Sequence, residues 1–207
     1  QGEVNNLKVN GFDITESGES AIGIGMGSSV SFRSIEISGS CNDNFFNVQR
    51  GSVVEIRDST IVATSTGRGI NVVGNSSFGF RNSTISGTAT DGNLVNIGSG
   101  SIAEIRDSTI SGTATNDSLV STNGGSYAKI RDSNVSWTVT GGDMVSVSSG
   151  SSVHLRGSTI SGTASLDSMS LLSVTRGSSI GAVSCSGKSY ASASDSTVPT
   201  LPDSCTQ

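Results

Sequence analysis

The 207-residue chain has few aromatic residues, few charges and little proline. Aromatic residues make up only 4% of it, which excludes a wide core filled by large rings but allows a narrow one of Val, Ile and Ala. Charged residues account for 14% and the net charge is −5, which disfavours both disorder and a nucleic acid partner. The run of roughly 18 apolar residues that a membrane-spanning helix needs is also absent.

Histidine and cysteine are scarce as well. No Ser-His-Asp set or His-rich metal site can be assembled around the single histidine, His154, so we expect a surface residue there and neither metal nor cofactor. Cys185 and Cys205 flank a non-repetitive tail and are expected to form a disulfide, which leaves Cys41 unpaired. Such a disulfide is typical of an oxidising compartment, and we therefore expect a secreted protein.

What the chain does contain is a repeat of 24 or 25 residues. It is marked by lines such as "VEIRDSTIVAT", "AEIRDSTISGT" and "VHLRGSTISGT", with degraded copies at both ends. The marker arginines are Arg33, Arg57, Arg81, Arg106, Arg131 and Arg156. A fixed period of this length predicts a solenoid of roughly eight coils.

Each copy contains three stretches in which apolar and polar residues alternate. Val95 and Ile97 flank Asn96 in the first, Ala103 and Ile105 flank Glu104 in the second, and the "TISGTA" segment forms the third. Period-two alternation predicts strands, and three strands per 24–25 residues predict an all-β, parallel β-helix. We expect this β-helix over residues 1–183, including an N-terminal cap coil, and a C-terminal capping segment over residues 184–207.

The segments "GSSVHLRGSTISGT" and "GSIAEIRDSTISGT" resemble the right-handed parallel β-helix repeats of secreted adhesins and pectin-lyase-like proteins. The resemblance covers about residues 9–183 and implies the fold rather than a function. Those families often carry Asn after "TISG", whereas this chain has Thr88, Thr113 and Thr163 there.

Aligning the third strand through the copies gives two outward columns, nine of whose ten members are Thr. Uncharged Ser and Thr residues flank them. The two columns are Thr64, Thr88, Thr113, Thr138 and Thr163, and Thr66, Thr90, Thr115, Thr140 and Ser165. The flanking residues are Ser86, Ser111, Ser136 and Ser161, and Thr60, Thr84, Thr109 and Thr159.

This pattern predicts a flat array with about 4.8 Å between coils and about 6.5–7 Å between Thr partners on one strand. It is similar to the Thr-x-Thr face of insect antifreeze proteins, and the resemblance implies that the protein binds the surface of ice. We expect a monomer without enzymatic activity. Thr columns also stabilise a sheet without any ligand. The alternative functions are a secreted adhesin or cell-wall structural module, in which the repeat serves as a spacer or as a carbohydrate-binding stalk, and a degenerate polysaccharide-acting enzyme.

Three further features of the sequence bear on these alternative functions. The Arg column, followed by Asp58, Asn82, Asp107 or Asp132, is typical of a solvated ladder of opposite charges rather than of a lyase site. Cys41 shares a column with Ala89 and Ala114 and is expected to point inward, whereas Trp137 falls awkwardly at a small inward position. Sequons occur at Asn75, Asn82, Asn116 and Asn134, and glycans on the last two would shade the Thr columns.

Overall fold

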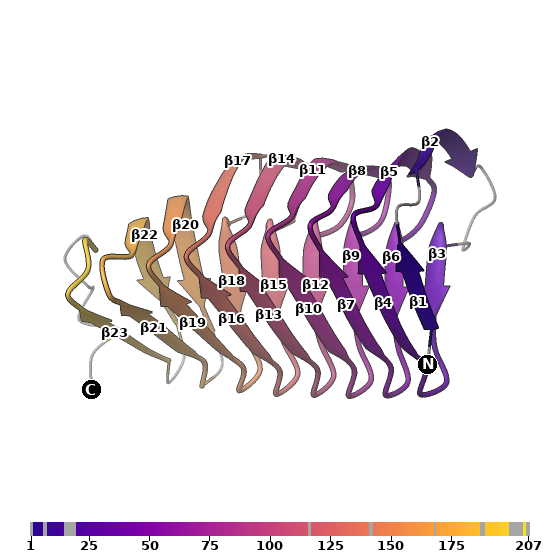
Figure 1. Ribbon diagram of the computed structural model, residues 1–207. Helices are drawn as coiled ribbons and strands as arrows, with labels where there is room; N and C mark the ends of the chain where they lie inside the picture. The colour runs from indigo at the N-terminus through magenta and orange to yellow at the C-terminus, as the bar shows by residue number, and fades with distance from the viewer. Residues whose placement is uncertain are drawn as a thin grey trace.

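The chain folds into a parallel β-solenoid whose coils stack side by side (Figure 1). The structure is a computed structural model that describes residues 2–5, 8–14, 20–115, 117–140, 143–167, 169–186, 189–198 and 205, with 2–14 and 137–140 described by their backbone alone. It confirms the all-β parallel solenoid with three strands per coil. The number of turns is about 6 rather than eight, because the copies at the two ends do not form complete three-strand coils.

Sheet A contains the second strand of every coil. All its strands pair in parallel with the arginines in register, so Arg57 lies beside Arg81 and Arg81 beside Arg106. In spatial order the nine strands are β1 (Gly2–Asn5), β4 (Ser29–Arg33), β7 (Val53–Arg57), β10 (Ser77–Arg81), β13 (Ile102–Arg106), β16 (Tyr127–Arg131), β19 (Ser152–Arg156), β21 (Leu171–Thr175) and β23 (Tyr190–Ser194).

Sheet B has two limbs that meet at β20. The Thr limb contains the third strand of each coil, and the Asn limb contains the short first strand. The Thr limb comprises β2 (Lys8–Ile14), β5 (Glu36–Cys41), β8 (Thr60–Ser65), β11 (Thr84–Ala89), β14 (Thr109–Thr115), β17 (Asn134–Thr140) and β20 (Thr159–Leu166), with β22 (Ser179–Cys185) paired to β20. The Asn limb comprises β3 (Ile22–Ile24), β6 (Phe46–Val48), β9 (Ile70–Val72), β12 (Val95–Ile97), β15 (Val120–Thr122) and β18 (Val145–Val147).

The core runs along the axis of the solenoid and is filled by the inward residue of each alternating pair. In one coil, Phe78 and Phe80 from sheet A and Ile85 from the Thr limb are all at most 2% exposed. The two Phe rings stack with their centroids 6.1 Å apart. Burial of such apolar surface, worth roughly 25 cal/mol per Å², is the main force that holds the coils together.

Buried serines form ladders at two corners of each coil. At the corner after sheet A, the amide N–H of Ser59 donates to Oγ of Ser83 at 3.0 Å, and that hydroxyl donates to the carbonyl of Arg81 at 2.7 Å. At the corner before sheet A, the amide of Ser76 likewise donates to Oγ of Ser101 at 3.1 Å. These ladders provide hydrogen-bond partners for buried backbone groups at the corners, which lie outside the pairing of the strands.

The coil that follows Arg156 is shorter than those before it. Ser158 bonds to Ser178, 20 positions along the chain, whereas Ser133 bonds to Ser158, 25 positions along. This coil therefore lacks the residues for two separate strands of sheet B. Its strand β20 pairs with β17 only at Thr159 and Ile160, and its residues 164–166 then pair with β18 of the Asn limb.

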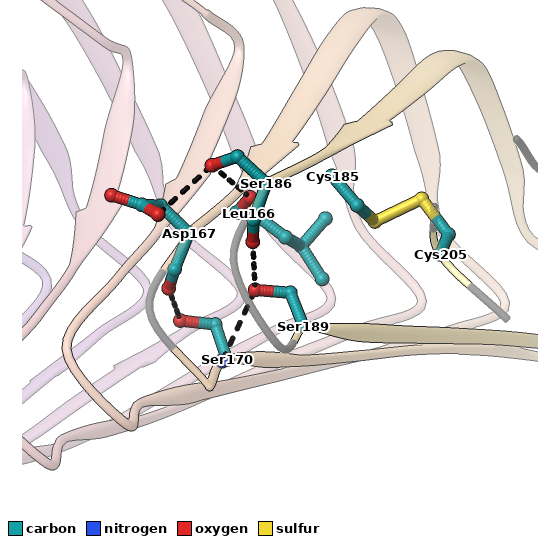
Figure 2. Close-up of a disulfide and its surroundings, with 7 residues drawn as sticks. All are labelled: Leu166, Asp167, Ser170, Cys185, Ser186, Ser189 and Cys205. Atoms are coloured by element: carbon teal, nitrogen blue, oxygen red, sulfur yellow. Dashed lines mark hydrogen bonds between the residues drawn. A yellow bond between two sulfur atoms is a disulfide. The ribbon is translucent and has the colours of Figure 1, made fainter. Parts of the chain in front are cut away.

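A disulfide ties residue 205 to the last coils. Cys185 at the end of β22 and the fully buried Cys205 form the expected disulfide, with an S–S distance of 2.04 Å (Figure 2). Beside it, the hydroxyl of Ser186 donates to Oδ1 of Asp167 at 2.9 Å, and that of Ser189 donates to the carbonyl of Ser186 at 2.9 Å. Within the segment expected to cap the solenoid, β23 adds the last strand of sheet A, while Pro199 and Pro202 lie outside the described residues.

Candidate functional site

The Thr columns lie in register on the outer surface of the Thr limb, whose strands β5, β8, β11, β14 and β17 are labelled along the top of Figure 1. Thr64, Thr88 and Thr113 are direct neighbours on β8, β11 and β14, and the backbone of β17 places Thr138 next in line. In the second column, Thr115 pairs with Thr140. Of Thr138 and Thr140 the structure describes only the backbone.

Thr66 and Thr90 lie one residue beyond the strands β8 and β11, but the backbone ladder continues through them. The amide of Thr66 donates to the carbonyl of Cys41 at 3.2 Å, and that of Thr90 donates to the carbonyl of Ser65 at 3.1 Å. Thr66 and Thr90 are both exposed. The hydroxyl of Thr66 donates to the carbonyl of Asn42 at 2.7 Å, which fixes the orientation of that side chain.

Small residues beneath the Thr columns support the face closely. Ala63 is fully buried, and its neighbour Gly87 has a φ of 147°, a conformation that L side chains rarely adopt. A Cβ at Gly87 would lie 1.8 Å from the carbonyl oxygen of Ala63, so only glycine fits there. Gly112 on the next strand has a similar φ of 141°.

The flanking residues also stack, although their columns are less uniform. Ser86 lies between Val62 and Ser111, and Ser111 pairs with Ser136. Thr84 lies between Thr60 and Thr109. The same column continues through Asn134 to Thr159 in one direction, and through Glu36 on β5 to Lys8 on β2 in the other. On β8, β11 and β14 the outward residues of the strands are uncharged, whereas at the N-terminal edge of the limb Glu36 on β5 pairs in register with Lys8 on β2.

Thr163 and Ser165 do not continue the Thr columns, and this prediction was wrong. The shortened coil diverts β20 after Ile160, so that Ser165 pairs with Ser146 on the Asn limb and Ala164 pairs with Val145 rather than extending the column of Ala89 and Ala114. Ser161 falls in the irregular stretch between Ile160 and Thr163, where the register shifts. The Thr array therefore ends at β17.

The structure describes three of the four sequon asparagines and the backbone of Trp137. Asn134 is exposed and lies in the flanking column, as expected, whereas Asn116 lies outside the described residues. Asn75 and Asn82 are exposed at other corners, and Nδ2 of Asn82 donates to Oδ1 of Asp58 at 2.7 Å. The backbone of Trp137 pairs with Gly112, but its side chain is not described.

Cys41 lies where its column predicts. Its neighbour in register is Ser65, which in turn pairs with Ala89, and Cys41 is only 3% exposed. Burial raises the pKa of the Cys41 thiol, which disfavours the reactive thiolate. Cys41 is therefore a small core residue.

On sheet A, the arginines form a ladder neutralised by carboxylates. Arg57 pairs with Glu55 at 2.6 Å, Arg81 with Glu104 at 3.2 Å, and Arg106 with Asp107 at 3.0 Å. Asp58, Asp107 and Asp132 occupy left-handed turn positions directly after the strands. The pairing recurs from coil to coil, as expected of a charge ladder, instead of gathering at one point.

His154 lies on the same surface, in register between Lys129 and Ser173. Partial burial, together with the positive charges of Lys129, Arg131 and Arg156, lowers the pKa of its imidazole. No group of three or more His, Cys, Asp or Glu side chains in the described part of the chain is arranged to hold a metal ion.

A depression of about 290 Å³ that was not predicted from the sequence lies on the outer surface of sheet A, over Gly79. Val53, Ser77, Ile102, Glu55, Arg81 and Glu104 are among the residues that line it. The signal was present in the sequence, because Gly79 occupies a column that holds Glu55 and Glu104 on the adjacent strands.

Comparison with protein-family models, with curated proteins and with solved structures finds no match to this chain. Among the described residues there is also no helix long and apolar enough to cross a membrane.

Proposed function

We propose that the protein binds ice through the Thr face, the outward surface of β8, β11, β14 and β17. The observation that carries this proposal is the register of Thr64, Thr88 and Thr113, continued by the backbone of Thr138. Parallel strands place these residues about 4.8 Å apart, with about 6.6 Å between Thr113 and Thr115 along one strand. A repetitive, uncharged lattice of this kind fits an ordered, repetitive ligand better than a single small molecule.

The face is suited to such a ligand because it is rigid before binding. Thr side chains have restricted χ1 rotamers, and the strands that carry them lie on a dry core in which Ile85, Ile110 and Ala89 are fully buried. Little conformational entropy is therefore lost when the face meets a surface. Methyl and hydroxyl groups held in register order water into a matching pattern that merges with the crystal, and the adsorbed protein blocks further growth.

The disulfide between Cys185 and Cys205 indicates an oxidising environment. We extend the proposal to a secreted protein that acts as a monomer and without enzymatic activity, since adsorption to ice needs only the exposed Thr face. The charged side chains gather on sheet A and at corners, where they do not interrupt that face.

Thermal hysteresis and ice-crystal shaping test the proposal, with Thr113→Tyr as the disruptive variant. Thr113 lies at the centre of the Thr face, where a tyrosine ring would hold the surrounding lattice away from a flat crystal. We expect this variant to lose most of the hysteresis while its free energy of unfolding changes by less than about 1 kcal/mol, as for other surface substitutions.

The matched control is Ser152→Tyr on sheet A. Ser152 is a half-buried outward residue next in register to Tyr127, so the same ring is already tolerated in that column. This variant should keep full hysteresis. A folded wild-type protein that neither lowers the freezing point nor shapes crystals would overturn the proposal, as would equal activity of Thr113→Tyr and the wild type.

A further inference from the structure

The depression over Gly79 has the size and the walls of a small binding site. Its volume of about 290 Å³ is near the lower end of the range for small-molecule sites. Both outward residues of β10 inside it, Ser77 and Gly79, are small, whereas the strands on either side carry Val53 and Glu55, and Ile102 and Glu104. The missing side chain at Gly79 thus opens a gap between Glu55 and Glu104, whose Cα atoms are about 10 Å apart, a distance of two strand spacings.

Nothing in the fold requires glycine at position 79. Among the residues with a positive φ, Gly79 does not appear, and a Cβ placed on it would make only ordinary contact with Cγ of Glu55, at 3.5 Å. A glycine inside a strand weakens the strand and often marks a place where a ligand approaches closely. Gly87 in the same coil differs, because its φ and the carbonyl of Ala63 exclude any side chain.

The polar groups around the depression are held in place by ion pairs. Arg81 reaches toward both glutamates, with Nε 3.6 Å from Glu55 and a terminal nitrogen 3.2 Å from Glu104. Glu55 also pairs with Arg57 and Glu104 with Arg131. Each of Glu55, Arg81 and Glu104 keeps between 29% and 39% of its side chain exposed, so these groups remain accessible to a ligand.

These charges define the chemistry of the ligand. Both carboxylates already have arginine partners, so the site has no net negative charge that would attract a cation. The carboxylates of Glu55 and Glu104 line the walls of the depression, which disfavours an anion. Alternating carboxylate acceptors and guanidinium donors suit neighbouring hydroxyl groups, which donate and accept at once. Val53 and Ile102, which are 47% and 52% exposed, add apolar walls for carbon-bound hydrogens.

We infer that sheet A carries a second binding site, over Gly79, for a neutral pyranose sugar. Hydroxyls of the sugar would donate to Glu55 and Glu104 and accept from Arg81, while one face of the ring packs on Ile102. The site lies on a different sheet from the Thr face and does not depend on ice binding.

Saturation-transfer NMR with the methyl glycosides of glucose, galactose and mannose, each at millimolar concentration, tests this inference. We expect the wild-type protein to transfer saturation to at least one of them, most strongly to ring protons. Gly79→Gln fills the depression with a side chain as long as its neighbours Glu55 and Glu104 and should reduce the transfer at least tenfold. Ser173→Gln, which adds the same side chain to the same outward column on β21, should leave it unchanged.

A second, smaller substitution keeps the test decisive if Gly79→Gln does not fold. Ile102→Ser introduces the residue that the same column already has at Ser77 and Ser152, and it should weaken binding several-fold. Absence of transfer to all three glycosides would overturn the inference, as would equal transfer in Gly79→Gln. Transfer confined to methyl glucuronide or to choline, tested in parallel, would also overturn it, because the site would then select charge.

Discussion

The Thr limb and sheet A are built from the same coils, yet their outward surfaces differ in kind. On the Thr limb Thr recurs in two outward columns from β8 to β14, as Thr60, Thr84 and Thr109 and as Thr64, Thr88 and Thr113. On sheet A the corresponding column changes from Glu55 to Gly79 to Glu104, and ion pairs link the strands. Strand pairing thus supplies a lattice, and the side chains decide whether that lattice presents a repetitive surface or a discrete site.

The largest expected effect comes from the glycine beneath the Thr face. Gly87→Ala places a Cβ 1.8 Å from the carbonyl oxygen of Ala63 and forces alanine into a φ near 147°, so the backbone must move. We expect it to lower the free energy of unfolding by more than about 3 kcal/mol, measured by urea denaturation.

The matched substitution on sheet A, in the same coil, should have the opposite sign. Gly79→Ala makes only ordinary contacts and is expected to stabilise the protein by about 0.5–1 kcal/mol, because glycine in a strand loses more entropy on folding than alanine. Equal destabilisation by the two alanines would break the comparison, since it would mean that both sheets need glycine for structural reasons.

The next largest effect on stability is expected at the C-terminal end, in the coils after the Thr limb and the Asn limb have merged at β20. Replacing Cys185 and Cys205 together by serine opens a loop of 20 residues, and we expect a loss of about 3 kcal/mol. Each coil of a solenoid contacts only its neighbours, so the loss should be local. Hydrogen exchange should rise in β21, β22 and β23.

The middle coils provide the internal control for that measurement. Amides of β8, β11 and β14 should keep their protection in the double serine variant, and thermal hysteresis should persist. Loss of protection throughout the solenoid would show that the C-terminal disulfide stabilises the whole rod, contrary to the local effect expected here.

A smaller effect than that of the disulfide is expected inside the Asn limb, whose inward residues share the core with sheet A and the Thr limb. Thr122 is fully buried in an inward column between Ile97 and Val147, and its hydroxyl has no hydrogen-bond partner in the described part of the chain. Thr122→Val keeps the shape and removes the unpaired hydroxyl, so we expect a gain of about 1 kcal/mol. Thr122→Ser, which keeps the hydroxyl and loses the methyl group, should instead lose about 1 kcal/mol. If valine destabilised the protein as much as serine, the hydroxyl would have a partner after all.

The repeat was sufficient to predict the fold and most of the Thr face, because a fixed period determines which residues stack. It was insufficient at the C-terminal end. The letters "TISGTAS" after Arg156 match the earlier copies, but strand pairing there depends on the length of the coil, which is 20 residues by the serine ladder rather than 25. Counting residues to the next coil, rather than comparing strand motifs, would have placed Thr163 and Ser165 on the Asn limb.

The depression over Gly79 was missed for a different reason. Its depth is a property of three adjacent strands, and it appears only when the side chains of Glu55 and Glu104 stand on either side of a residue that has none. Within one strand, the segment "SFGFR" shows alternation and a small outward residue, which is compatible with an ordinary surface. Reading the columns across strands, as was done for the Thr residues, would have found it.

The measurement that tests the central claim most directly is partition of the fluorescently labelled protein between a slowly growing ice crystal and the surrounding liquid. We predict that the wild-type protein enriches in the ice, that Ser152→Tyr behaves in the same way, and that Thr113→Tyr remains in the liquid. Exclusion of the folded wild-type protein from the ice would contradict the account and leave the Thr columns as a ladder that only stabilises the sheet.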